Sequence, residues 1–164
     1  MAICKFFDMV ATLPKGQKII GLDVGKKTIG VAIGDATHNI ASPHRIIWRK
    51  KFTADMTDLL AEMDDLQVGG LVIGWPLNMD GTEGPRCDST RDFAHALLRL
   101  KDIPISFQDE RWSTQAVERS MVDADMTRKN RHLRRDALAA TWILQSAFDL
   151  YHQNSLDAPA PLPV

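Results

Sequence analysis

The stretch IIGLDVGKKTIGVAIG, residues 19–34, predicts how the chain folds. Its first apolar run, residues 19–24, contains one charged side chain, Asp23, close to its end. Its second run, residues 28–34, is rich in β-branched residues, and the short segment 25–27 between the two fits a hairpin turn. The stretch therefore predicts two antiparallel strands, the first apolar enough to be covered on both faces.

The segments that follow the hairpin predict an α/β sheet. Residues 41–48 form a third candidate strand, and residues 52–65 carry apolar side chains at helical spacing. Two further strands are expected at residues 70–74 and 105–108, separated by a helix over residues 91–100. Strands joined by tight turns should be antiparallel, whereas strands joined through helices favour parallel pairing. We therefore expect a mixed five-stranded sheet, three antiparallel strands and then parallel ones, with helices on both faces.

The two ends of the chain differ from this central pattern. Helices are expected over residues 113–122 and 136–151, the second being the more strongly periodic. The first eighteen residues show no clear period and fit an arm or a short surface helix, while the proline-containing last ten fit a disordered tail. We predict an N-terminal arm at 1–18, one domain at 19–154 and a tail at 155–164.

Composition places the chain among globular proteins. It has 164 residues, 45% hydrophobic and 25% charged, which suits one domain. No apolar run approaches the roughly 20 residues of a membrane-spanning helix, and the N-terminus lacks a secretory signal pattern. Two cysteines, Cys4 and Cys87, suit a reducing cytosol better than a disulfide framework. The net charge of -1 is weak evidence against a large nonspecific nucleic-acid surface, without excluding a nuclease.

Asp23 and Asp136 are acids in apolar surroundings. A carboxylate in a covered strand is costly unless it is paired, hydrogen-bonded or bound to a metal, although a strand-end Asp can also accept N–H groups of the next turn. Asp136 shares one helical row with Ala140 and Ile143, and so apolar a row should face the sheet. The helix dipole would explain an acid in the first turn, but it would not explain an acid on the buried row.

Glu110 follows the strand expected at residues 105–108, so it shares with Asp23 a position at the carboxyl end of a parallel strand. A solvated charge or an ion pair with Arg111 would also explain it. Three carboxylates from separate segments can hold Mg²⁺ or Mn²⁺, and two such ions can promote phosphoryl displacement. We therefore predict that Asp23, Glu110 and Asp136 are both the catalytic and the metal-binding residues.

The same segments resemble the motifs of the YqgF family, nucleases similar to Holliday junction resolvases. The motifs are DVGKKTIGVA at 23–32, PLNMDGTEGP at 76–85, DERWST at 109–114 and DALAA at 136–140. They occur in the family's order and cover most of the chain. The resemblance implies an RNase H-like fold and a metal-dependent nuclease, with Mg²⁺ or Mn²⁺ as the ions. It also implies 5′-end maturation of pre-16S rRNA in the cytoplasm, with ribosome-assembly factors as further partners.

The family's acids correspond to Asp23, Glu110 and Asp136. Many RNase H-like enzymes carry an acid at the end of the fourth strand, but the corresponding strand here ends in Gly74-Trp75. Glu110, one strand further out, is expected to take that role. Asp80 and Asp109 are the alternatives.

Residues beside these motifs are candidates for contacts with nucleic acid, because basic and polar side chains position phosphates without reading bases. Ordinary surface charge would also account for any one of them. Asn78 is expected chiefly to shape its loop, and core packing is more expected of Trp75 and Trp112 than base stacking. A dense basic cluster also surrounds the predicted start of the last helix. The candidates are Lys26, Lys27, Asn78, Arg86, Arg111, Lys129 and Arg131.

Other functions remain open on the sequence alone. The same chemistry could act on branched DNA, as in a Holliday junction resolvase. An actin-like or sugar-kinase-like ATPase also has an Asp-x-Gly hairpin, but it closes two related domains around the nucleotide and this chain has room for one. A non-catalytic nucleic-acid-binding module would not need the three acids. Structured RNA is the expected substrate, and no membrane association is expected.

Overall fold

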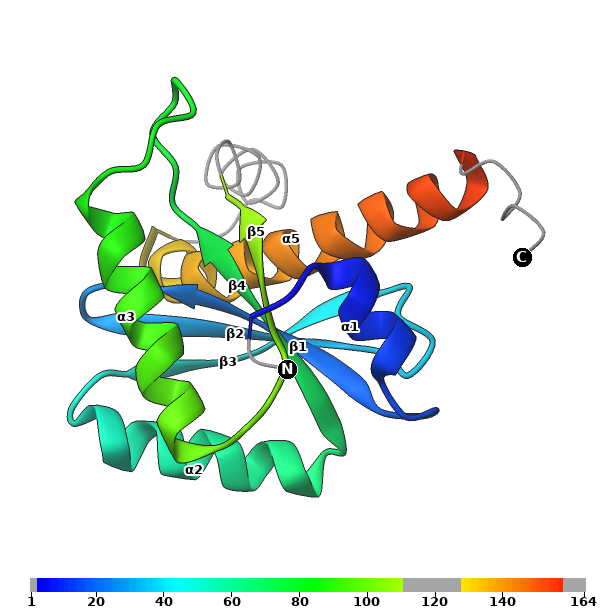
Figure 1. The fold of residues 1–164 in the computed structure, drawn as a ribbon. Coiled ribbons are helices and arrows are strands. Elements are labelled where there is room, and N and C mark those ends of the chain that lie inside the picture. Colours follow the sequence, from blue (N-terminus) through cyan, green and yellow to red (C-terminus); the bar gives the residue numbers. More distant parts are fainter. Residues whose placement is uncertain (1–2, 111–127, 158–164) are drawn as a thin grey trace.

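A computed structural model describes residues 3–110 and 128–157, with side chains in the last helix described from residue 137 to residue 153. Its sheet has the strand order β3-β2-β1-β4-β5 (Figure 1). Strands β1, β2 and β3 are antiparallel neighbours, whereas β1, β4 and β5 are parallel. The predicted mixed five-stranded sheet is therefore confirmed. The strands are β1 (Lys18–Val24), β2 (Thr28–Gly34), β3 (Ala41–Trp48), β4 (Val68–Trp75) and β5 (Ile105–Asp109).

Helices cover both faces of this sheet, as predicted (Figure 1). Helices α2 (Phe52–Asp65) and α3 (Pro85–Leu100) pack on one face, and α1 (Phe6–Thr12) and α5 (Arg128–Asp157) pack on the other. The helix predicted at 113–122 lies outside the described residues. No helix in the described part of the chain is long and apolar enough to cross a lipid bilayer.

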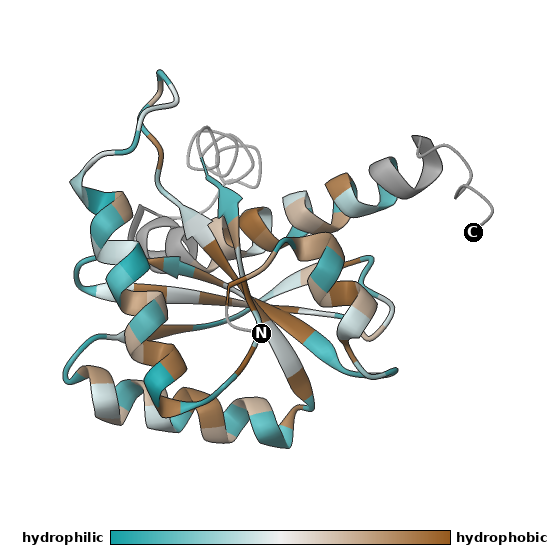
Figure 2. Ribbon diagram, viewed as in Figure 1, coloured by the Kyte–Doolittle hydropathy of each residue, from teal (hydrophilic) through white to brown (hydrophobic). Residues whose placement is uncertain are grey.

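Alternation along β1 sets the direction of its side chains. Ile20 and Leu22 belong to the core under α2 and α3, whereas Ile19 belongs to the core under α5. Since successive strand residues point to opposite faces, Asp23 lies on the α5 face with Ile19 and Gly21. Figure 2 shows hydrophobic residues along the centre of the sheet and hydrophilic ones in the loops around it. The acid of the opening motif thus stands at the end of an apolar strand, on the side of the last helix.

Gly21 lets helix α5 lie directly on the sheet. A Cβ at this position would come 2.8 Å from Leu144 Cβ and 3.0 Å from the Ala140 carbonyl oxygen. The predicted buried row on the helix is confirmed, because Ala140, Ile143 and Ala147 are all nearly inaccessible to solvent. The close approach fixes the distance between the helix backbone and β1.

Two helices begin earlier than the sequence indicates. Helix α3 begins at Pro85, directly after Gly84, because proline is well suited to the first position of a helix. Helix α5 begins at Arg128, about two turns before Asp136. The expectation that Asp136 occupies the first turn is therefore wrong, since the intervening Arg, Lys and Leu residues are good helix formers. The helix dipole does not account for an acid in the interior of α5.

The N-terminal residues pack against the fold. Met9 of α1 is fully buried, and Ile3 forms a parallel bridge with Ile105 at the edge of β5. The Cys4 backbone N–H also donates a hydrogen bond to the Ile105 carbonyl, at 2.8 Å. Cys4 and Cys87 are free thiols. The sequence fitted either an arm or a short surface helix in this region, and the structure has a helix, α1. The domain boundaries at 18 and 154 stay a prediction.

The loop after β2 yields a prediction about acid stability. Partial burial raises the pKa of the Asp35 carboxyl, but hydrogen bonds from the Ile40 and Asn39 backbones and from Thr37 outweigh burial and lower that pKa to about 2. Because the unfolded pKa is about 3.9, the stabilisation is complete above that pH and is lost as pH falls toward about 2. We expect Asp35→Asn to lower the free energy of unfolding by about 1 kcal/mol at neutral pH.

The measurement for Asp35→Asn is urea unfolding of both proteins at several pH values. The difference in unfolding free energy should narrow as the pH falls below about 4. A difference that stays constant down to about pH 2 would mean that the carboxylate charge contributes nothing.

Candidate active site

Asp23 and Glu110 meet at the carboxyl ends of the central parallel strands. Asp23 lies near the end of β1, opposite Gly30 of β2, and is half-buried. Glu110 directly follows β5, where its backbone N–H donates a 3.2 Å hydrogen bond to the Trp75 carbonyl of β4. A side-chain hydrogen bond joins the carboxyl groups of Asp23 and Glu110. Two acids far apart in the sequence therefore come into direct contact.

Gly74 of β4 leaves the space in which this contact forms. A Cβ at Gly74 would lie 2.6 Å from Glu110 Oε2 and 2.6 Å from Ile143 Cδ1. The Glu110 carboxylate thus fills the place that a side chain on β4 would occupy, on the face of the sheet that α5 covers. This arrangement explains how an acid from beyond β5 reaches Asp23 across the intervening strand.

The surroundings of Glu110 disfavour its negative charge. Its side chain is 13% exposed. Burial raises the pKa of the Glu110 carboxyl, against the lowering effects of the Arg86 guanidinium and of the hydrogen bond with Asp23, and the charge of Asp109 raises it further. A hydrogen bond between two carboxyl groups also requires a proton on one of them. The pair is therefore a site where added positive charge is favourable.

The third predicted acid is described by its backbone alone. Asp136 lies in α5, two turns before Ile143, the residue that contacts the space over Gly74. Among the side chains that the structure describes, no three His, Cys, Asp or Glu residues gather into a metal-binding group. The Asp136 side chain is outside that set, so its part in the site stays a prediction.

The two alternatives to Glu110 lie differently. Asp80 accepts hydrogen bonds from the Thr82 backbone N–H and hydroxyl within its own loop. Asp109 pairs with Trp75 in the sheet and is exposed. Glu110, by contrast, makes a side-chain hydrogen bond with Asp23. The geometry favours Glu110.

Asn78 shapes the loop between β4 and α3, which projects from the body of the fold (Figure 1). Its backbone N–H donates to the Thr82 carbonyl at 2.9 Å, and its amide donates to the Thr82 hydroxyl at 3.0 Å. Gly84 passes close to the same amide. These contacts give Asn78 a role in closing the loop, and contact with nucleic acid stays a prediction.

Two of the predicted basic residues line one cleft. Lys26, in the turn between β1 and β2, and Arg86, in the first turn of α3, both border a cleft of about 540 Å³. Arg86 also extends toward Glu110, with 3.8 Å between its guanidinium and Glu110 Oε1. Lys27, in the same turn as Lys26, is exposed and is not among the lining residues.

The sequence analysis missed two further cations of this cleft. Arg49 and Lys50, between β3 and α2, line it together with Lys26 and Arg86. The run Arg49-Lys50-Lys51 directly after β3 was the available signal. These residues lie outside the acidic motifs, so their place in the sequence did not connect them with Asp23 or Glu110.

The remaining candidates fall into two groups. Trp75 packs against Phe107, with 4.6 Å between ring centroids, and the Arg91 guanidinium lies 5.2 Å from its ring centre. This packing agrees with the role expected for Trp75. Arg111 and Trp112 lie outside the described residues. Lys129 and Arg131 are described only as backbone in the first turns of α5.

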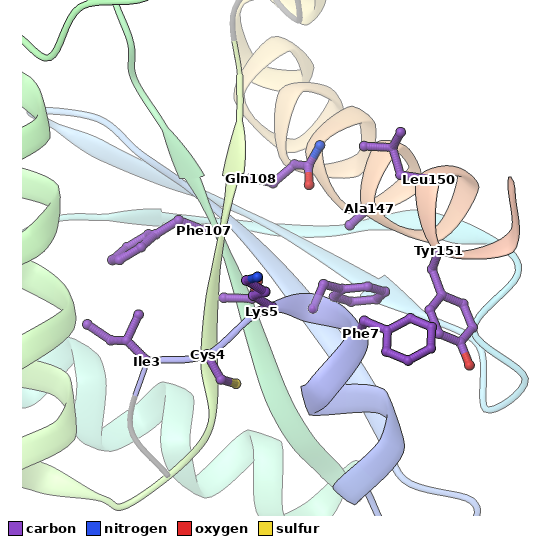
Figure 3. Close-up of a pocket in the computed structure, with 11 residues that line it drawn as sticks. Ile3, Cys4, Lys5, Phe7, Phe107, Gln108, Ala147, Leu150 and Tyr151 are labelled. Atoms are coloured by element: carbon purple, nitrogen blue, oxygen red, sulfur yellow. The ribbon is translucent and has the colours of Figure 1, made fainter. Parts of the chain in front are cut away.

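A second hollow has a different character (Figure 3). It lies between the N-terminal segment, β5 and α5, and its lining includes Phe7, Phe107 and Tyr151. Lys5 is the one charged residue among those described along it. The hollow is mainly apolar and lacks acids, so it does not extend the carboxylate site.

The comparisons agree with the fold. The chain resembles RuvC from T. thermophilus, solved with a Holliday junction substrate, with a TM-score of 0.53 over 84% of this chain and 96% of that one, at 13% identity. The fold is thus that of the RNase H-like resolvases, as predicted. A model of the RuvX family, described as Holliday junction resolvase, matches residues 17–150, and the chain belongs to this family. The predicted resemblance is confirmed.

Similar bacterial proteins are provisionally named pre-16S rRNA nucleases. The relative from Phenylobacterium zucineum is 52% identical over 151 residues, covering 91% of this chain and 97% of the relative. The relative from Paramagnetospirillum magneticum is 50% identical over 142 residues, covering 87% of this chain and 92% of the relative. Both matches cover at least 87% of this chain.

Proposed function

We propose that this protein is a divalent-metal-dependent nuclease that hydrolyses phosphodiester bonds, with Asp23, Glu110 and Asp136 as the metal-binding acids. The observation that carries the proposal is the hydrogen-bonded pair of Asp23 and Glu110 at the ends of the central strands. Active sites of open α/β sheets form at this edge. A structural role alone gives no reason to bring two carboxyl groups together in a partly buried place.

The residues present fit a divalent cation. Carboxylate oxygens are the ligands that Mg²⁺ and Mn²⁺ prefer, and Asp23 and Glu110 supply such oxygens. Burial raises the pKa of the Glu110 carboxyl and the Arg86 guanidinium offsets only part of that effect, so a bound cation would be favourable beside it. Asp23 and Glu110 would hold the ion, and the number of ions stays a prediction.

The register between α5 and β1 supports Asp136 as the third acid. Phe148 packs at Gly34 beside Ile19, and Ala140 and Leu144 pack at Gly21. From Ala140, one turn back along α5 is about 6 Å and leads to Asp136. From Gly21, two residues along β1 are about 6.6 Å and lead to Asp23. The backbone of Asp136 therefore corresponds in register to Asp23.

The chain's own residues have distinct parts in the proposed reaction. Asp23 and Glu110 would hold the cation, and Arg86 beside Glu110 is placed to contact a phosphate oxygen. Metal ions at such a site supply an activated water and stabilise the leaving oxygen. Helix α5 excludes solvent from one side of the carboxyl pair, which strengthens electrostatic contacts there.

The proposed substrate is the precursor of 16S rRNA at its 5′ end, with action in the cytoplasm. The names of the relatives from Phenylobacterium and Paramagnetospirillum support this choice. The family description and the RuvC likeness support branched DNA as a second candidate substrate. Ribosome-assembly factors as partners stay a prediction.

Cleavage assays separate the two substrates. A transcript carrying the 16S precursor 5′ region and a four-way DNA junction are each incubated with the protein in Mg²⁺, in Mn²⁺ and in chelator. We expect specific cleavage of the transcript with either ion and none in chelator. Cleavage of the junction alone would replace the RNA assignment, and full activity in chelator would contradict the nuclease mechanism itself.

Metal binding should also be visible without turnover. Binding to the folded state alone stabilises a protein by RT ln(1 + [L]/Kd), so Mn²⁺ at about 100 times its Kd should raise Tm by roughly 5–10 °C. Asp23→Asn should remove most of this shift, as measured by thermal unfolding. Asp58→Asn is the matched control, because it neutralises an exposed acid of α2. An equal shift in the two variants would place the ion elsewhere.

A further inference from the structure

The charged side chains that line the cleft beside the carboxyl pair are all positive. Its cations come from three separate segments: Lys26 from the β1–β2 turn, Arg49 and Lys50 from the β3–α2 connection, and Arg86 from α3. No Asp or Glu is among the described residues that line it. Ordinary protein surfaces intersperse both signs, so a cleft lined by cations alone indicates a polyanionic ligand.

Arg49 is held in place rather than extended into solvent. Its guanidinium donates a 2.7 Å hydrogen bond to the Gly25 carbonyl and lies 5.7 Å from the centre of the Phe93 ring. Its backbone N–H donates to the Lys27 carbonyl at 2.8 Å. An arginine fixed in this way loses less conformational freedom when it binds an anion, and most of its five donors remain available.

The segment that carries Lys50 is also ordered. The Lys50 backbone N–H donates a 2.9 Å hydrogen bond to Asp55 Oδ2 at the start of α2. The Asp55 carboxylate therefore accepts a hydrogen bond from the backbone, and Asp55 is not among the residues that line the cleft. Lys50 thus enters the cleft from a fixed connection without an acid opposite it.

Arg86 links the cleft to the proposed active site. Arg86 lines it and also approaches Glu110, at 3.8 Å. Val24, the residue after Asp23, lines it from the opposite face of β1. From Arg86 to Phe93 the wall formed by α3 is about 10 Å long, enough to contact more than one phosphate of a nucleic-acid strand.

We propose that this cleft binds the sugar-phosphate backbone of the substrate strand as it leaves the carboxyl pair, with Arg49 and Lys50 contacting phosphates beyond the bond that is cut. The inference rests on the proposed function, because it requires the strand to pass Asp23 and Glu110. Its contacts are to phosphate, so they give affinity and register without base specificity. Arg86 connects the two parts of the path.

Salt-dependent binding tests the proposal. The probe is a fluorescein-labelled single-stranded RNA, and its affinity is measured by anisotropy in chelator at several salt concentrations. Each phosphate contact contributes about 0.7 to the slope of log K against log[salt], so Arg49→Gln with Lys50→Gln should reduce the slope by roughly 1.4. Lys50→Gln alone leaves the Arg49 packing intact and should reduce it by about 0.7.

The matched control is Lys15→Gln with Lys51→Gln, which removes two positive charges at exposed lysines that do not line the cleft. Its slope should equal that of the wild type. An unchanged slope in the Arg49 and Lys50 variants, or an equal reduction in the control, overturns the proposal.

Wild-type cleavage is measured separately in Mg²⁺. If the wild type cleaves and the slope is unchanged, the cleft assignment alone is wrong; if the slope falls and nothing is cleaved, the cleft assignment holds and the nuclease assignment is wrong.

Discussion

Asp23→Asn is expected to abolish cleavage while leaving the fold and the affinity for nucleic acid close to those of the wild type. The amide keeps the size of the side chain but cannot supply the negative charge that a divalent ion needs. Loss of several kcal/mol of transition-state stabilisation corresponds to a rate reduction of roughly 100-fold or more. The measurement is the single-turnover cleavage rate, with RNA binding in chelator recorded in parallel.

The variant should not be less stable in the absence of metal. Asp23 and Glu110 share a partly buried site, and asparagine removes one potential charge there while its amide can still donate a hydrogen bond to the Glu110 carboxylate. We therefore expect the Tm of Asp23→Asn in chelator to equal or exceed that of the wild type, as is common for residues kept for activity. Asp58→Asn serves again as the control, with unchanged cleavage. Wild-type cleavage rates in Asp23→Asn would remove this residue from the catalytic site.

Gly74→Ala is expected to have the second large effect. The added methyl group would lie 2.6 Å from Glu110 Oε2 and from Ile143 Cδ1, so the Glu110 carboxylate must move away from Asp23. A displacement of about 1 Å at a catalytic group can cost about 100-fold in rate. Overpacking against Ile143 should also lower the free energy of unfolding by about 1–3 kcal/mol.

Gly34→Ala separates the two effects of Gly74→Ala. A Cβ at Gly34 would collide with the ring of Phe148 in α5, and Gly34 lies at the end of β2 away from Gly30, the residue opposite Asp23. This variant should lose a comparable amount of stability, measured by urea unfolding, but keep its cleavage rate per folded molecule. If Gly74→Ala also kept that rate, the space over Gly74 would matter only for packing.

Local patterns explain how much of the fold was predictable. Strands β2 and β3 and helix α2 have the predicted bounds, because alternation, tight turns and helical spacing are read from neighbouring residues. Asp23 and Glu110 were also identified from position, since both end strands that the connections make parallel. The sequence thus sufficed for the sheet and for the two acids that meet on it.

Contacts between distant segments explain what was missed. The burial of Met9 depends on its packing over Gly70, where a Cβ would lie 2.6 Å from the sulfur. The cleft depends on α3 lying beside the β3–α2 connection, so Arg49 could not be assigned from its neighbours in sequence.

The space above Gly74 has an evolutionary consequence. A carboxylate at the end of β4 and a carboxylate arriving from beyond β5 would occupy the same volume, so a working site accommodates one of them. Among related nucleases, an acid at position 74 should therefore be accompanied by a non-acidic residue at 110, and glycine at 74 by an acid at 110. The ancestral chemistry could in this way pass from one strand to its neighbour through paired substitutions, without any change in the course of the backbone.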